Sequence, residues 1–288
     1  MDEDPPGGAE GLTRDTLKDL IADADAVGLG FNERLARDWH RRGLLGSPQR
    51  QSLGRGRGST AGVYSREQRA LFQAISRNRA AGIKLPTLAS LPIWAWLNFE
   101  GWVDLAQLRR AMNTAVGNPR VSDRVASQTA QILLRLVDHQ HGRPGDRGTL
   151  RDEMVEQLRR GRINTKRLLP KVEAVFQPTG PIPIARGPLG ASMTAQDFTY
   201  ILSVRMLAAV KLKNVTDEQL LTARSQHRTT WAEYQQFRKY LEANGGSLAW
   251  LFRELPDNEQ VASSVGNLLS LVGFQLQAQP TSHPGGTP

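Results

Sequence analysis

The chain has 288 residues, no cysteine and a formal net charge of +9. This length suffices for about two compact domains, and the lack of cysteine excludes disulfide scaffolds, thiol catalysis and thiolate-bound zinc or iron–sulfur sites. No apolar run approaches the roughly 20 residues of a membrane helix. The acidic start Met1-Asp-Glu-Asp also differs from the basic, then apolar start of an export signal. We therefore expect a cytoplasmic protein that does not bind membranes.

The charge is distributed unevenly along the chain. Residues 1–32 carry a net charge of −6, residues 33–79 carry +8, and residues 109–171 again carry +8. Arginine outnumbers lysine by 30 to 7, which suits phosphate and base recognition, although a GC-rich genome gives the same ratio with no functional cause. A GC-rich genome does not explain why the basic residues cluster in two segments. This clustering indicates an acidic partner.

Helical periodicity dominates, and we expect a mainly α fold. The two ends, 1–12 and 278–288, are unpatterned and predicted to be disordered tails. Residues 177–192 hold four prolines and three glycines and are predicted to be a linker. Between these segments we predict a DNA-binding domain at 13–98, a basic helical region at 99–176 and a C-terminal helical domain at 193–277.

The first three helices are predicted from apolar spacing and from capping residues. Apolar side chains between Leu17 and Ala24 recur at i, i+3, i+4 and i+7, which predicts one apolar helix face. Asn32 is expected to cap a second helix, which ends at Gly43. Ser65 is expected to start a third helix.

Later helices are predicted from similar signals. Asn118-Pro119 is expected to start a helix that ends in the turn-rich segment 141–148. A final helix is expected to carry apolar residues from Val261 to Val272. Three further starts resemble capping boxes, at Thr194…Asp197, Thr216…Gln219 and Thr230…Glu233, with a glycine stop after Asn244.

The stretch from residue 17 to residue 85 carries the functional signal. A short helix, a glycine-containing turn and a second helix give the layout of a helix-turn-helix. Arg34, Arg37 and Arg41 fall on one face of the second helix, as groove binding requires, although a solvated face has the same pattern. Trp39 lies on the other side and is compatible with either a core position or contact with a phosphate.

A glycine- and arginine-rich segment follows the second helix. It reads Arg50-Gln-Ser-Leu-Gly-Arg55-Gly-Arg57-Gly. A hairpin tip of this composition can approach a phosphate backbone or enter a minor groove. We therefore interpret it as the wing of a winged helix, the alternative being a flexible loop.

Four elements in this order resemble the MerR family of bacterial transcription regulators. The sequence Gly30-Phe-Asn-Glu-Arg-Leu-Ala-Arg-Asp-Trp-His-Arg-Arg-Gly-Leu-Leu45 is similar to the recognition helix of that family. Pro48 and Arg50 fall where its wing begins, and Tyr64-Ser65 resembles the pair that ends the wing. The stretch from Arg79 to Leu85 resembles its Arg-x-x-Gly-hydrophobic-x-Leu element. The resemblance covers about a quarter of the chain.

The resemblance implies an N-terminal winged helix-turn-helix with double-stranded DNA as its partner. It implies phosphate contacts by Arg37 and Trp39 and contacts of the wing arginines with the flanking backbone or minor groove. A homodimer or higher oligomer and RNA polymerase are further expected partners. Together with the helix pattern, it gives this set of predicted DNA-binding residues: Asn32, Arg34, Arg37, Trp39, Arg41, Arg50, Arg55, Arg57 and Tyr64.

The chain departs from that family in a longer first turn, a longer wing and two further respects. The long dimerisation helix expected after Leu85 is interrupted by Pro86 and Pro92. The cysteines with which some members sense metals are missing, so metal-responsive chemistry is not expected.

Three other features are interpreted more simply. The aromatic row Trp231, Tyr234, Phe237 and Tyr240 has helical spacing and is predicted to be core, a ligand pocket or partner groove being the alternative. The apolar segment 92–97 is also predicted to be core. The basic cluster at 159–167 is a candidate extension of the DNA-binding surface.

The nucleotide-binding loop, nucleophile-elbow and zinc-protease motifs are all missing from the sequence. We therefore expect no enzyme, no cofactor and no metal site. The favoured function is a sequence-specific, double-stranded DNA-binding transcription regulator associated with the nucleoid. One alternative is an architectural, partition or recombination accessory factor of a plasmid or phage. Another is a protein-interaction adaptor.

Overall fold

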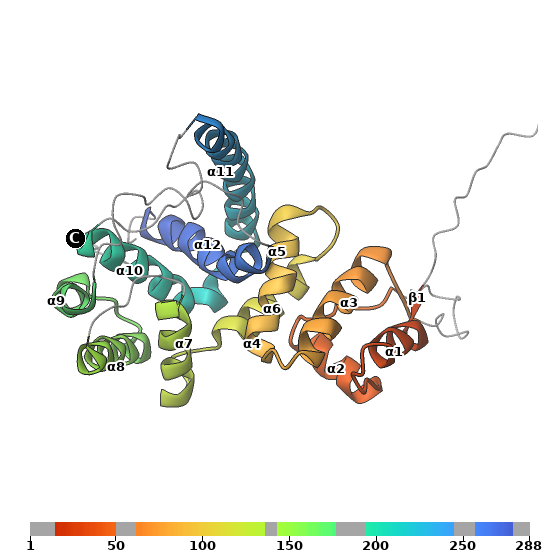
Figure 1. Cartoon of the computed structure of the whole chain (residues 1–288). Coiled ribbons are helices and arrows are strands. Elements are labelled where there is room, and N and C mark those ends of the chain that lie inside the picture. Colours follow the sequence, from red (N-terminus) through yellow and green to blue (C-terminus); the bar gives the residue numbers. More distant parts are fainter. Residues whose placement is uncertain (1–14, 50–61, 136–142, 177–193, 245–256, 279–288) are drawn as a thin grey trace, which may run out of the picture.

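The computed structural model describes residues 15–49, 62–135, 143–176, 194–244 and 257–278. These residues are mainly helical, as predicted, and the strand content is one pair of two-residue strands (Figure 1). The predicted tail 1–12, the linker 177–192 and the wing arginines Arg50, Arg55 and Arg57 lie outside the described residues, as does the tail beyond Ala278. No described helix combines the length and apolar character required to cross a membrane.

The elements of the first hundred residues are β1 (Asp15–Thr16), α1 (Leu17–Asp25), α2 (Glu33–Arg41), β2 (Val63–Tyr64), α3 (Arg66–Ala80), α4 (Leu85–Leu88) and α5 (Ser90–Asn98). They are followed by α6 (Leu105–Val116), α7 (Asp123–Arg135), α8 (Pro144–Arg160), α9 (Thr165–Val175), α10 (Ala195–Lys211), the 3₁₀ helix η2 (Leu212–Asn214), α11 (Asp217–Asn244) and α12 (Asp257–Ala278).

Most of the predicted helix starts are confirmed by their caps. The Asn32 side chain accepts a hydrogen bond from the Leu35 amide (3.0 Å), and the Ser65 hydroxyl accepts one from the Gln68 amide (3.3 Å). Reciprocal bonds form the box at Thr194 before α10 and the box at Thr216 before α11. These caps satisfy amides that have no partner within the helix.

The predicted start at Asn118-Pro119 is wrong by several residues. Residues 119–121 form a turn, and α7 begins at Asp123. The Asn118 side chain accepts from the Arg120 amide (3.3 Å), a local bond that favours a turn over a helix. Ser122 supplies the cap instead, because its hydroxyl accepts from the Val125 amide (3.3 Å).

Two other boundary predictions are also wrong. The segment 141–148 was expected to be a turn, but α8 begins at Pro144, because proline is favoured at the first helical position. Thr230 was expected to open a helix, yet it lies inside α11. Its hydroxyl donates to the Gln226 carbonyl (2.8 Å), which is how threonine is accommodated within a helix.

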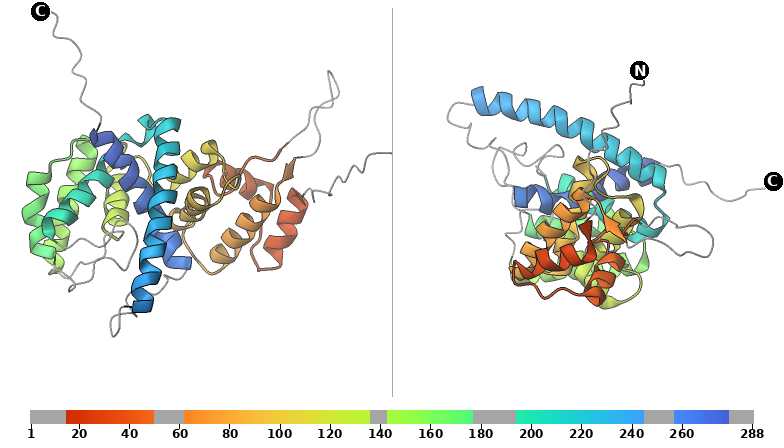
Figure 2. Two further views of the ribbon diagram at one scale, coloured as in Figure 1. Left: turned by 90° about the horizontal axis from the view of Figure 1, so that it is seen from above. Right: turned by 90° about the vertical axis from the view of Figure 1, so that its right-hand side faces the viewer.

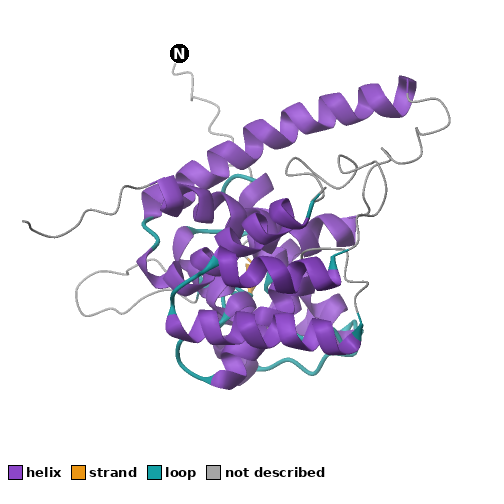
Figure 3. Cartoon of the chain, turned by 90° about the vertical axis from the view of Figure 1, so that its left-hand side faces the viewer, coloured by secondary structure: helices purple, strands orange, loops and turns teal. Residues whose placement is uncertain are grey.

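The aromatic row of α11 is only partly core, contrary to the prediction. Tyr234 is buried and Trp231 is half-buried, whereas Phe237 is 47% and Tyr240 64% exposed. Helical spacing places these rings on one side of α11. The other described elements, however, cover only part of the length of this helix. In Figure 3 the far end of α11 projects from the remaining helices.

One continuous apolar core runs through the described residues, from Leu20 in α1 to Val272 in α12. The segment 92–97 is core as predicted, with Ile93 and Leu97 fully buried in α5. Helix α12 packs on α10 and α11 and also on α5, while α10 packs on α7 and α9. Packing therefore crosses both predicted boundaries, at residue 98 and at 177–192. Helices α1–α3 lie at one end of the molecule and α8–α9 at the other (Figures 1 and 2).

Candidate nucleic-acid interface

Helix α2 presents a basic face to solvent and an apolar face to the protein. Ala36 and Trp39 are buried, three residues apart on the inner side. Arg34, Arg37 and Arg41 are exposed on the outer side. The three arginines that the sequence placed on one face are therefore all accessible to a partner.

Trp39 takes the core position, one of its two predicted alternatives. It is 1% exposed and packs against Phe31 (5.1 Å between ring centroids) and Phe72 of α3 (5.4 Å). A ring buried to this extent does not reach a phosphate. Its role is to fix the distance between α2 and α3.

The exposed arginines of α2 differ in their ion pairing. Arg41 lies 3.2 Å from the Asp38 carboxylate, which also holds Arg42 at 2.7 Å. Arg34 has no acidic partner among the described residues, and Arg37 only donates to the Glu33 carbonyl (3.4 Å). Arg34 and Arg37 therefore keep their full charge for an external anion, whereas Arg41 shares its charge with Asp38.

The ends of the predicted wing meet beside β2. Gln49 and Val63 exchange two backbone hydrogen bonds, of 2.8 and 2.9 Å. Val63 also belongs to β2, which pairs antiparallel with β1. The two described positions that flank the predicted wing, Gln49 and Val63, are therefore neighbours. Arg50, Arg55 and Arg57 lie between them in the sequence, outside the described part of the chain.

His40 connects α2 to β2. Its Nδ1 lies 3.2 Å from the Leu45 carbonyl and its Nε2 3.0 Å from the Tyr64 hydroxyl. A carbonyl only accepts, so Nδ1 carries the proton and Nε2 accepts from Tyr64. Burial lowers the pKa of His40, which keeps the ring neutral. Tyr64, a predicted DNA-binding residue, is buried and serves this internal contact.

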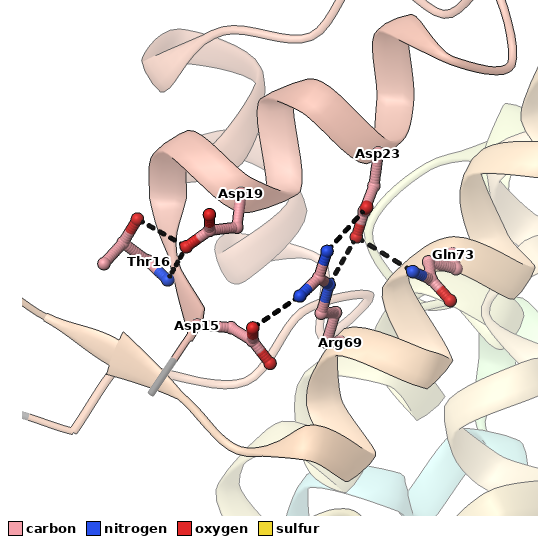
Figure 4. Close-up of polar contacts among 6 residues, drawn as sticks. All are labelled: Asp15, Thr16, Asp19, Asp23, Arg69 and Gln73. Atoms are coloured by element: carbon pink, nitrogen blue, oxygen red, sulfur yellow. Dashed lines mark hydrogen bonds and ion pairs between the residues drawn. The ribbon is translucent and has the colours of Figure 1, made fainter. Parts of the chain in front are cut away.

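Arg69 of α3 joins α1 and β1 through two aspartates (Figure 4). Its guanidinium donates two bonds to Asp23 (2.7 and 2.9 Å) and one to Asp15 (2.5 Å), and Gln73 adds a bond to Asp23 (3.0 Å). The hydrogen bonds from Arg69 hold the pKa of Asp23 below its usual value. This arrangement fixes α1 against α3.

Helix α6 supports the carboxyl end of α2. Gly43 has a φ of +71°, and a Cβ there would lie 2.5 Å from the Gln107 carbonyl oxygen, so only glycine fits. About two turns further along α6, the Thr114 hydroxyl donates to the Arg42 carbonyl (2.8 Å). These contacts connect α2 with the middle of the molecule.

The basic cluster at 159–167 is mostly neutralised by nearby acids. Arg159 pairs with Asp123 (2.7 Å), Arg160 with Glu156, and Arg167 with Glu153 (2.9 Å). Arg162 and Lys166 have no acidic partner within the described ranges. The number of basic side chains at 159–167 therefore overstates the positive charge that this cluster presents to solvent.

Several residues that organise the site were missed in the sequence. Asp15 and Asp23 counted toward an acidic N-terminus, although they pair with Arg69 of the basic segment. His40 and Thr114 were assigned no role in the sequence, because their roles depend on partners 24 and 72 residues away. Periodicity placed Trp39 on the side of the helix opposite the arginines but left open whether it is a core residue or a phosphate contact.

No family model, curated protein or solved structure matches the chain. Within the described ranges there is no group of three or more His, Asp or Glu side chains that could hold a metal ion. The proposed function therefore rests on the residues and their geometry.

Proposed function

We propose that the protein is a sequence-specific regulator that binds double-stranded DNA through α2 and the wing at 50–61. The observation that carries the proposal is α2 itself: it buries Trp39 on one side and exposes Arg34, Arg37 and Arg41 on the other. A basic helix preceded by α1 and a turn, and fixed against α3, is the arrangement that places a recognition helix in a major groove.

Phosphate contacts by arginine would supply most of the affinity, so binding should weaken steeply as salt increases. Arg37 is expected to act mainly on phosphates. Arg34 and Arg41 are the candidates for bidentate contacts with guanine edges, each worth about 1–3 kcal/mol of discrimination. The proximity of the two wing ends to α2, through His40 and Tyr64, would bring the wing to the same duplex.

The test is selection of a binding site from random duplexes, followed by fluorescence anisotropy on the selected duplex. Arg37→Ala should lower affinity for selected and scrambled duplexes alike, and Arg34→Ala should lower the ratio between them. Arg147→Ala is the matched control, because Arg147 is an exposed arginine of α8 at the other end of the molecule. Equal binding by the parent, Arg34→Ala and Arg37→Ala would refute the proposal.

Genome-wide mapping of bound sites separates this function from that of an architectural or partition factor. A regulator should occupy promoters, whereas an accessory factor should occupy clustered sites elsewhere. DNA binding that did not weaken with salt would favour the adaptor alternative. Binding to one class of protein, with no binding to DNA, would favour it as well.

A further inference from the structure

A polar groove lies where the carboxyl end of α6 meets η2. It consists of two adjoining hollows, of about 350 Å³ and about 180 Å³, which share Asn113, Leu212 and Lys213 as lining residues. The turn after α6 supplies Asn118 and Arg120 to the larger hollow. The total volume is in the range of sites that bind small molecules.

The groove is positively charged. No Asp or Glu side chain of the described residues lines it, whereas Arg109, Arg120 and Lys213 do. Arg109 is neutralised by Asp217 (2.5 Å), but Arg120 and Lys213 have no acidic partner in the described structure. Two cations of opposite walls, one on the α6–α7 turn and one on η2, are thus left for an external anion.

Arg120 lies beside the carboxyl end of α8 and has no carboxylate partner among the described residues. Its Nε lies 3.2 Å from the position that a Cβ would occupy on Gly161, the left-handed residue that ends α8. Glycine thus lets the guanidinium approach the carboxyl end of α8, where the helix dipole favours a cation.

Amide groups complete the groove. The side chains of Asn113 and Asn214 make no hydrogen bond to any described residue, and both line the larger hollow. Cations beside free amide donors suit a phosphate, whose oxygens accept several hydrogen bonds. We propose that this groove binds a small ligand that carries a phosphate group.

The position of the groove suggests a consequence for DNA binding, which rests on the proposed function. Asn113 precedes Thr114, whose hydroxyl holds the carbonyl at the end of α2. A ligand that shifts this turn of α6 would shift the orientation of α2 and so change affinity for DNA. The coupling requires that the two α6 arrangements bind the ligand differently.

Pyrophosphate is a suitable probe, added to the full chain at constant ionic strength with chloride as balance. We expect the thermal midpoint to rise saturably, by about 5 °C at a hundred times the dissociation constant. The variant R120Q/K213Q should bind at least tenfold more weakly. K211Q is the matched control, because Lys211 is exposed beside η2 but does not line the groove. No saturable rise, or an equal rise in R120Q/K213Q, would overturn the site.

A second measurement separates this site from the proposed function. DNA affinity should change on addition of pyrophosphate in the parent and not in Thr114→Val, which should still bind the probe. Unchanged DNA affinity in the parent would overturn the coupling but not the site. Weaker DNA binding by R120Q/K213Q without the probe would assign the groove to the DNA backbone instead. A protein that binds pyrophosphate but no DNA would refute the proposed function alone.

Discussion

At the scale of single residues, His227 makes stability depend on pH. It is 4% exposed in α11, stacks on Trp231, and its Nε2 has no hydrogen-bond partner in the described structure. Burial, with a smaller effect of the Arg228 charge, lowers the pKa of His227 to about 4. Below about pH 6.5 His227 therefore binds a proton in the unfolded chain but stays neutral in the folded protein until the pH approaches 4.

The free energy of unfolding should consequently fall as pH falls from 6.5 toward 4. Between pH 7 and pH 5 the expected loss from this residue is about 2 kcal/mol. Urea unfolding of the parent and of His227→Gln at both pH values measures it, since the variant cannot titrate. Any slope left in the variant would come from other groups, such as His40, whose pKa burial also lowers. Identical slopes in the two proteins would contradict this role for His227.

Arg69 should contribute more to stability than its neighbours on α3. Replacing it with methionine would leave Asp15 and Asp23, both largely covered, without a counter-charge. The cost should be about 2 kcal/mol, less than for a fully buried pair because Arg69 is itself one-third exposed. Arg66→Met is the control, because Arg66 is exposed on the same helix. Chemical denaturation measures both; equal midpoints for the two variants would refute the prediction.

At the scale of elements, Gly43 and Gly28 form a natural comparison. Both have a φ above +70°, so alanine at either should cost about 1–2 kcal/mol of backbone strain. At Gly28 a Cβ meets nothing within 4 Å, whereas at Gly43 it collides with the backbone of α6. Gly43→Ala should therefore cost about 1–3 kcal/mol more, as urea unfolding would show. Equal costs would mean that α6 does not pack against this turn.

Elements set by local chemistry were predictable from the sequence. The caps at Asn32 and Ser65 were found because a capping side chain acts on an amide three residues away. The wrongly predicted starts at Asn118 and Thr230 also carry side chains that can cap a helix. Each of these side chains instead forms a different local hydrogen bond. Which partner prevails depends on the packing of the whole helix.

The site was predictable to the same extent. Periodicity placed Arg34 and Arg37 on an outer face and Trp39 on the inner one, since both follow from helix geometry. Charge counting did not reveal that Arg69 pairs with Asp23 or that Arg159 pairs with Asp123, because these pairs form between different elements. The groove could not be predicted from the sequence for the same reason, because Arg120 and Lys213 are about ninety residues apart along the chain.

At the scale of the whole molecule, the core determines how the chain can be divided. Helix α5 lies within the predicted DNA-binding domain, yet it packs on both α6 and α12. Likewise α10 covers α7 and α9. Removal of α10–α12 would expose the apolar faces of α5, α7 and α9 to water, at about 25 cal/mol for each Å² uncovered.

A fragment of residues 1–192 should therefore lose the cooperative unfolding of the full chain and bind a hydrophobic dye. A fragment of residues 1–278 is the control, because it keeps every described residue and should unfold at the parent's urea concentration. Circular dichroism during urea titration compares the three proteins. If the 1–192 fragment unfolded at the parent's midpoint, α1–α9 would be an independent unit, and the contacts of α12 with α5 would add nothing to stability. The groove between α6 and η2 would then lie between two separable parts.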